Sequence, residues 1–381
     1  MKIVILGGGF GGITAALELG AALGGEHSVV LIERAPVFMM GLRKLWMVTG
    51  KGTRREGERA LAQLRAAAVE VRQASVQAID VRARVVRTDG GDVSFDYLII
   101  ALGAEPRPDL VSGFSPAAYN LYGVADAERL AQRVREFRAG RLVIAILGVP
   151  YKCPPAPYEA AMMLDDLFRA RGTRGAIQIQ TFTPQPMSLP VVGRQNCAQV
   201  EGLLAAKGIG FTPNRKVARL EGPVLVFDDG SRVEADLLMG VPPHRPPVVV
   251  RESGLEMRGE WLAVDPATLR ASADGVFAVG DVNEIPLANG MALPKAGLFA
   301  ESEAKVAAGQ IIAELHRSPS PAPFDGRGHC FIETGGGQAT MVQGQFLASP
   351  APALTIAAPS AEALRQKIEF ERTRLESWFG A

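Results

Sequence analysis

A glycine-rich loop between a short apolar strand and a helix constrains the fold of this chain more than any other feature. The apolar residues 2–6 are followed directly by the sequence GGGFGG at residues 7–12 and by a helical pattern over residues 13–23. A second apolar strand over residues 28–32 then ends in Glu33. Strand, glycine loop, helix, strand and acidic residue in this order are typical of a dinucleotide-binding α/β fold, which the sequence therefore predicts at its N-terminus.

Each of these positions has a physical role in holding a dinucleotide. Gly7 permits a tight turn, Gly9 lets the backbone approach a pyrophosphate, and Gly12 lets the helix pack closely on the strand. The free N–H groups and the dipole at the start of the helix stabilise the phosphate charge. Glu33 lies 21 residues after Gly12 (33 − 12) and is placed to accept hydrogen bonds from an adenosine ribose.

Two later segments point to the identity of the nucleotide. One is a buried strand that ends in a small-residue turn at Gly103, and the other is a buried strand that ends in Gly280-Asp281. They resemble the later FAD-binding segments of flavoproteins that have two dinucleotide-binding domains. In that family the aspartate binds the ribityl chain, and the next helix, expected here from about Pro294 to Ile312, points its N-terminus at the flavin. FAD is therefore the expected cofactor, and no metal site is expected.

Residues 106–254 predict a second α/β unit that has lost its nucleotide loop. Its first strand covers residues 141–148 and its first helix residues 158–170. A reductase that uses NAD(P)H would carry a second glycine fingerprint between them, but only Gly148 remains here. Four prolines follow it, which remove backbone donors and fill the space that a pyrophosphate needs. We therefore expect no tight binding of NAD(P)H.

The turn after that first strand carries a cysteine instead. Cys153 lies in the sequence VPYKCPPAPYE at residues 149–159, and Cys330 follows 177 residues later (330 − 153) in the sequence GHCF. Three cysteines without a CxxC motif do not form a disulfide framework, and a cytoplasmic chain uses such residues for catalysis or for packing. Packing is the expected role of Cys197, whereas Cys153 and Cys330 are candidates for sulfur chemistry.

These cysteine segments, with LPKAG at residues 293–297, carry a resemblance to the sulfide-oxidising flavoproteins over nearly the whole chain. That group comprises the sulfide:quinone oxidoreductases and the flavoprotein subunit of flavocytochrome c sulfide dehydrogenase. The resemblance implies that Cys153 and Cys330 form a redox-active pair beside the flavin, which sulfide attacks to leave a persulfide before two electrons reach FAD. Glu159 would accept a proton or only complement a helix dipole, and Lys295 would favour the anionic reduced flavin.

Departures from that group leave the electron acceptor open. Many quinone-linked members carry a third cysteine before the first, where this chain has Asn120-Leu121-Tyr122, and Cys197 does not match that position. The set of two cysteines is closer to the flavocytochrome type. A quinone is the expected acceptor and cytochrome c the alternative. An NADH:acceptor oxidoreductase is a further alternative, against which the proline-filled loop argues.

The predicted fold class is α/β, with two Rossmann-like dinucleotide-binding domains and a small C-terminal α+β module. The FAD-binding domain is discontinuous over residues 1–105 and 255–318, with the second domain over residues 106–254 and the module over residues 319–381. Within this module, the glycines at residues 335–337 are expected to turn a hairpin that carries Cys330 over the flavin.

Composition and hydropathy limit the classes of partner that the protein is expected to have. A net charge of +1 gives no reason to expect a nucleic acid, and no apolar run reaches the roughly 18 residues that a membrane span needs. The chain starts on an apolar strand without an export leader, so a cytoplasmic protein is expected, with attachment to the membrane surface as an alternative. A homo-oligomer is left open.

The last predicted helix, over residues 361–379, has two alternative roles. Its apolar stripe either packs on the protein or forms a face that contacts a membrane or a partner next to a quinone channel. The stripe consists of Leu364, Ile368, Leu375 and Phe379 at near-helical spacing, with Trp378 beside them.

Overall fold

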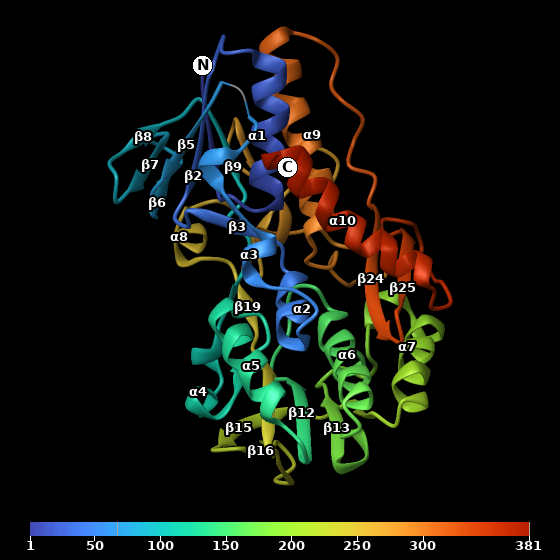
Figure 1. Ribbon diagram of the computed structural model, residues 1–381. Helices are drawn as coiled ribbons and strands as arrows, with labels where there is room; N and C mark the ends of the chain where they lie inside the picture. The colour runs from blue at the N-terminus through green and yellow to red at the C-terminus, as the bar shows by residue number, and fades with distance from the viewer. Residues whose placement is uncertain (67, 381) are drawn as a thin grey trace.

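A parallel five-stranded sheet forms the core of the first unit. A computed structural model describes residues 1–66 and 68–380, and Figure 1 shows how its elements are arranged. The strand order is β22-β9-β1-β2-β5, and every pairing is parallel. The inner strands are buried on both faces, which explains their continuous apolar sequences, whereas the edge strand β5 alternates apolar and polar residues. The strands are β1 (Lys2–Leu6), β2 (Ser28–Glu33), β5 (Val69–Gln73), β9 (Tyr97–Ile100) and β22 (Val276–Ala278).

A second parallel five-stranded sheet lies at the opposite end of the molecule (Figure 1). Its strand order is β11-β18-β12-β13-β14, again with every pairing parallel. Two sheets of this kind confirm the predicted fold class of two Rossmann-like units. The strands are β11 (Tyr119–Asn120), β12 (Gly140–Ile146), β13 (Ile177–Phe182), β14 (Gly210–Thr212) and β18 (Leu237–Val241).

Helices that follow the strands cover both sheets. In the first unit, α1 (Phe10–Leu23) and α9 (Gly297–His316) pack side by side, and α1 lies against β1 and β2 (Figure 1). In the second unit, α6 (Ala156–Ala170) packs on β12 and β13, next to α7 (Arg194–Ala206). Both α1 and α6 begin at the carboxyl end of a central strand, which is where open α/β sheets bind their ligands.

The C-terminal module is an antiparallel sheet with one long helix. Strands β24 (Arg327–Gly335), β25 (Gln338–Gln345) and β26 (Ala353–Ile356) pair in sequence order. The three glycines at residues 335–337 form the turn between β24 and β25, as the sequence predicted. Each of them has a positive φ, which glycine adopts without strain. Strand β24 packs on α6, and α10 (Ala361–Phe379) runs from this hairpin towards α1 (Figure 1). The module therefore connects the two units.

The described chain contains further helices and small sheets. Three short helices are α2 (Arg43–Thr49), α3 (Arg54–Gly57) and α8 (Val248–Arg251), and the longer α5 (Val124–Glu136) packs against α2 and β11. Two small antiparallel sheets consist of β6 (Val76–Asp80), β7 (Val85–Thr88) and β8 (Val93–Ser94), and of β15 (Val217–Glu221), β16 (Val224–Phe227) and β17 (Arg232–Glu234).

One expectation about helices needs correction. The late helix starts at Gly297, not near Pro294, because the backbone before it is extended and the carbonyl of Lys295 accepts a hydrogen bond from Cys153. The side chains of Leu375 and Trp378 on α10 are buried, so this end of the helix packs on the protein, which is one of its two predicted roles. Within the described residues, the helices are all too short or too polar to cross a bilayer.

Candidate functional site

A cavity of about 480 Å³ collects the predicted site segments from both units and from the C-terminal module. This volume falls in the range of small-molecule sites, roughly 300–1,000 Å³. The wall combines the glycine loop after β1, the turns after β9 and β22, the start of α9, the cysteine loop before α6, and parts of β24 and α10. The predicted residues in the wall are Gly7, Gly9, Glu33, Gly103, Cys153, Glu159, Gly280, Asp281, Lys295 and Cys330.

The glycine loop has the geometry that an approaching phosphate needs. Gly7 has a φ of +102°, and a Cβ on it would lie 2.3 Å from the carbonyl oxygen of Ala101. Gly12 lies behind the cavity wall, where a Cβ would be 1.7 Å from the carbonyl oxygen of Gly7. Gly9 faces the cavity, and a Cβ there would meet no atom within 4 Å. The first two glycines therefore serve close packing, whereas Gly9 leaves space for a ligand.

Glu33 is held in place by the backbone around it. Its Oε2 accepts a hydrogen bond of 2.7 Å from the N–H of Gly8, and its Oε1 accepts one of 2.8 Å from the N–H of Ala35. Each carboxylate oxygen keeps further acceptor capacity. A ribose in the cavity would therefore find a fixed pair of acceptors at the end of β2.

Lys295 and Asp281 place opposite charges in the wall beside the start of α9. The Lys295 ammonium donates to the carbonyl of Asn283 and lies 3.8 Å from the centre of the Trp261 ring. Burial lowers the pKa of Lys295 to about 8, although Asp281 opposes this shift. Burial likewise raises the pKa of Asp281, and Lys152 and Lys295 oppose that change. The glycine loop, Glu33 and these charges together fit the adenosine, pyrophosphate and flavin parts of FAD.

The two candidate cysteines come from different parts of the fold, and both line the cavity. Cys153 lies in the loop before α6 with a φ of +48°, and Cys330 lies on β24. Both side chains are half-buried free thiols, so the structure contains no disulfide between them. Each thiol changes the pKa of the other: Cys330 lowers the pKa of Cys153, and Cys153 raises that of Cys330. Both residues of the predicted pair line the cavity, and their redox pairing stays a prediction.

Cys197 lies elsewhere, as the sequence predicted. It is buried in α7, and its Sγ lies 3.0 Å from the carbonyl oxygen of Leu189. It packs in the core and does not line the cavity.

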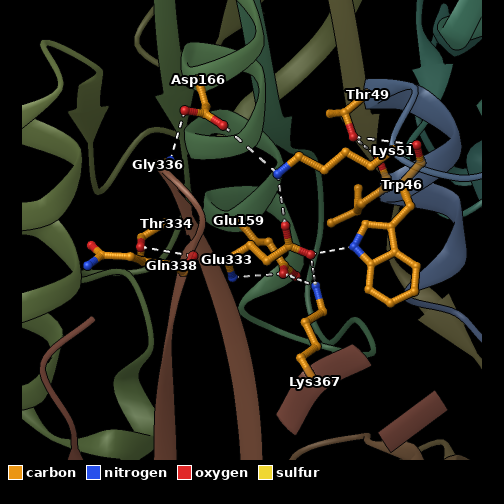
Figure 2. Close-up of polar contacts among 11 residues, drawn as sticks. Trp46, Thr49, Lys51, Glu159, Asp166, Glu333, Thr334, Gly336, Gln338 and Lys367 are labelled. Atoms are coloured by element: carbon orange, nitrogen blue, oxygen red, sulfur yellow. Dashed lines mark hydrogen bonds and ion pairs between the residues drawn. The ribbon is translucent and has the colours of Figure 1, made fainter. Parts of the chain in front are cut away.

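Glu159 belongs to a buried ion cluster that the sequence did not reveal. Its Oε1 accepts the backbone N–H of Glu333 at 2.9 Å and also pairs with the ammonium of Lys367 on α10 (Figure 2). Burial raises the pKa of Glu159, although Lys367 opposes the shift. A carboxylate that merely complemented the dipole of α6 would be solvated, whereas this one is 3% exposed in the cavity wall.

Two further lysines add positive charge near Cys153. Lys152 donates a hydrogen bond of 3.1 Å to the carbonyl of Ala104, and both Lys152 and Lys44 line the cavity. Burial and the charge of Lys152 lower the pKa of Lys44 to about 8, whereas Cys153 acts in the opposite direction. The sequence carried a signal for Lys152, because it directly precedes the cysteine, but none for Lys44.

Comparison with known proteins places the chain among redox flavoproteins. The profile of the pyridine nucleotide-disulphide oxidoreductase family matches residues 1–296. The chain belongs to this family. Its members bind FAD, and the cavity described above has the parts that such a cofactor requires.

The similar proteins identify the branch of the family. The mitochondrial sulfide:quinone oxidoreductase of Dictyostelium discoideum is 25% identical over 351 residues, which cover 87% of this chain and 75% of that protein. The crystal structure of sulfide:quinone oxidoreductase from Aquifex aeolicus shares the fold, with a TM-score of 0.89 at 24% identity over 98% of this chain and 90% of that one. These matches confirm the resemblance that the cysteine segments indicated.

An NADH-linked enzyme is also among the matches. Type II NADH:quinone oxidoreductase of Haemophilus influenzae is 24% identical over 363 residues, covering 84% of this chain and 81% of that protein. The chain is therefore an oxidoreductase of the flavoprotein branch that holds both kinds of quinone reductase.

Proposed function

We propose that this protein oxidises sulfide through Cys153 and Cys330, with FAD as its cofactor and a quinone as electron acceptor. The observation that carries the proposal is that both thiols line the same cavity as the glycine loop and Glu33. Cys153 precedes α6 in the second unit and Cys330 lies on β24 of the C-terminal module, so the whole fold is needed to bring both residues to this cavity.

The chemistry of the pair starts from its oxidised form. Hydrosulfide attacks one sulfur of the Cys153–Cys330 disulfide, the bond between the cysteines breaks, and a new sulfur–sulfur bond forms as a persulfide. The other cysteine leaves as a thiolate. FAD, when bound, supplies an acceptor for the electron pair. Anions form at this point of the cavity, and the charges of Lys367, which favours both thiolates, and of Lys44 stabilise them there.

The loop at Cys153 supports sulfide over NADH as electron donor. Helix α6 begins at Ala156 between two prolines, and the N–H of Cys153 already donates to the carbonyl of Lys295 at 2.7 Å. A second pyrophosphate would need free N–H groups at this helix start. The start of α6 offers few free N–H groups, because proline has none and the N–H of Cys153 already donates to Lys295.

The lining on the side of the module supports a quinone. Phe331 and Phe370 lie in the cavity wall near Cys330, together with Leu42 from the segment before α2. An adjoining surface groove shares Leu298 and His329 with the cavity and extends it towards solvent. An apolar wall that opens to the surface fits a flat, apolar acceptor. Cytochrome c, as a protein, would instead have to accept electrons at the surface.

Anaerobic spectroscopy of the flavin tests the proposal. The purified protein should be yellow with bound FAD, and sulfide should bleach it rapidly, whereas NADH and NADPH should do so slowly or not at all. A water-soluble quinone analogue should then restore the colour. Fast bleaching by NADH without bleaching by sulfide would contradict the proposal and favour an NADH:quinone oxidoreductase. Reoxidation by cytochrome c but not by the quinone would replace the acceptor.

A further inference from the structure

A row of alternating acidic and basic side chains runs from the cavity to the protein surface. Lys367 contacts Glu159 and lies 2.9 Å, from Nζ to Oε1, from Glu333. The other oxygen of Glu333, Oε2, lies 3.1 Å from Nζ of Lys51, which in turn lies 3.9 Å from Oδ2 of Asp166. Figure 2 shows these five side chains in a continuous series. They come from α6, α10, β24 and the turn after α2.

Exposure to solvent rises along this row. The side chains of Lys367 and Glu333 are 2% and 1% exposed, whereas those of Lys51 and Asp166 are 36% and 33% exposed. Glu159 and Lys367 line the cavity at the inner end. The row therefore has one end in the cavity that Cys153 and Cys330 also line and the other in water, with a dry section between them.

The charge of Glu159 acts directly on both cysteines. It raises the pKa of Cys153 and of Cys330, as a nearby negative charge does. Burial raises the pKa of Glu159 itself, so this carboxylate takes up a proton more readily than an ordinary glutamate. Glu159, at the inner end of the row, is therefore suited to accept a proton from a thiol.

The groups around Glu333 keep it negative in the dry section. Burial opposes its charge, but Lys367, the indole N–H of Trp46 and Lys51 together lower its pKa. Burial also opposes the charge of Lys367, and the two glutamates overcome it and raise its pKa. The ring of Trp46 lies 5.3 Å from Nζ of Lys367. The neighbouring Arg43–Glu371 pair joins α2 to α10 beside the row.

We infer that these five residues form a proton relay between the cysteine pair and solvent. The inference rests on the proposed function of that pair. When a thiol ionises, its proton moves to the carboxylate of Glu159. Lys367 takes this proton from Glu159 as it gives another to Glu333. Glu333, which is negative at rest, passes that proton directly to Lys51, and Lys51 gives one to Asp166 or water. Each ammonium ends in its original state, and one proton has left the cavity. The same steps in reverse return a proton to a thiolate.

An ion cluster that only ties elements together is the alternative, and Lys51 separates the two roles. Arginine at this position keeps a charge between Glu333 and Asp166, but a guanidinium does not release its proton in a protein. A structural tie therefore survives Lys51→Arg, whereas a relay does not. Lys51→Met removes both the structural tie and the relay. Lys305→Met is the matched control, because Lys305 is exposed on α9 and pairs with Glu301 at 3.4 Å away from the row.

The test is a stopped-flow pH jump on the reduced holoprotein, which follows the ultraviolet absorbance of the cysteine thiolate. The wild type and Lys305→Met should form the thiolate quickly. Lys51→Arg and Lys51→Met should form it more slowly, by about tenfold or more, and imidazole buffer should restore the rate. Asp166→Asn should slow it less, because water also reaches Lys51. Alkylation by iodoacetamide against pH should give the same thiol pKa in wild type, Lys51→Arg and Lys305→Met, because these variants keep the charges of the row.

Equal thiolate rates in wild type and Lys51→Arg, with or without imidazole, would overturn the relay and leave a structural tie. A thiol pKa that changes in Lys51→Arg would do the same, because a relay changes rates and not the equilibrium. The pH jump uses no sulfide. A protein that sulfide does not bleach would therefore refute the proposed function, while the pH jump would still decide whether the thiols exchange protons through Lys51.

Discussion

The backbone N–H of Cys153 donates a hydrogen bond of 2.7 Å to the carbonyl of Lys295. This bond joins the cysteine loop of the second unit to the segment that leads into α9 of the first. The hydroxyl of Tyr122 donates to the carbonyl of Cys153 at 3.1 Å and holds the next peptide group, on the other side of the same Cα. The cysteine therefore keeps a left-handed backbone conformation, which is uncommon for a residue other than glycine, because both of its peptide groups are engaged.

Replacing either cysteine should abolish sulfide-driven bleaching of the flavin. Cys153→Ala and Cys330→Ala should each retain FAD, and the double variant should be no slower than the single ones, because a disulfide needs both partners. Cys197→Ala is the control, since Cys197 is buried in α7 away from the cavity. Stopped-flow absorbance under anaerobic conditions measures all four variants. Full activity of either single variant would disprove the redox pair.

Replacing Glu33 should weaken the retention of FAD. Each hydrogen bond to a charged group contributes roughly 1.5–3 kcal/mol, so Glu33→Ala should raise the dissociation constant by at least about tenfold. Glu33→Gln should weaken binding too, because its amide group would face the N–H of Gly8 or of Ala35. Glu70→Gln on β5, exposed and outside the cavity, is the control. Fluorescence titration of apoprotein with FAD measures the constants, and unchanged constants in both Glu33 variants would remove Glu33 from the cofactor site.

Local signals in the sequence predicted most of the fold. The strands at residues 2–6 and 28–32, and the helix at residues 361–379, lie within one residue of the observed bounds. Each of these elements is specified by its own apolar pattern and by the glycine or polar residues that flank it. The predicted start of α9 was wrong, because a tertiary hydrogen bond to the carbonyl of Lys295 keeps the backbone before Gly297 extended.

Local sequence patterns did not predict the ion cluster of Glu159, Lys367 and Glu333. The apolar stripe placed Ile368 on the buried face of α10, but Ile368 is 49% exposed and Lys367 is buried instead. Lys367 finds its partner Glu159 208 positions away, on another element. One signal was available, because Lys367, Glu371 and Leu375 repeat at a spacing of four, as residues on one helix face do. The pairing of Cys153 with Cys330 was implied by resemblance to a family and not by spacing, and it stays a prediction.

The end of α10 should contribute to stability and not to membrane contact. Trp378 is 5% exposed, and its ring centre lies 5.4 Å from those of Phe10 and Phe38. Trp378→Ala should lower the free energy of unfolding by about 3–5 kcal/mol, as truncation of a buried aromatic residue does. Ile368→Ser, at a half-exposed position of the same helix, should change it by less than about 1 kcal/mol. Urea denaturation measures both variants. A stable Trp378→Ala protein that no longer binds lipid vesicles would instead support the membrane-facing role.

Glu303 should make the protein less stable as the pH rises towards neutrality. This carboxylate on α9 is buried, accepts the N–H of Gly280 at 2.6 Å and the amide of Asn283 at 2.7 Å, and has a pKa that burial raises from 4.5 to about 7. In the folded protein it therefore binds a proton more tightly than in the unfolded chain. Its contribution to stability is fully present below about pH 4.5 and is lost as the pH rises through about 7.

Glu303→Gln tests this dependence, because glutamine resembles the protonated acid and does not titrate. The variant should match the wild type near pH 5 and exceed its stability near pH 8 by roughly 2–3 kcal/mol, at about 1.4 kcal/mol for each unit of pKa shift. The same two acceptor contacts remain available to the amide oxygen. Glu252→Gln, at an exposed position before β20 (Met257–Arg258), should leave the pH profile unchanged. Thermal unfolding of the holoprotein across this pH range measures the difference. Parallel profiles for wild type and Glu303→Gln would show that Glu303 is already ionised at pH 5, with its charge held by Gly280, Asn283 and Lys295.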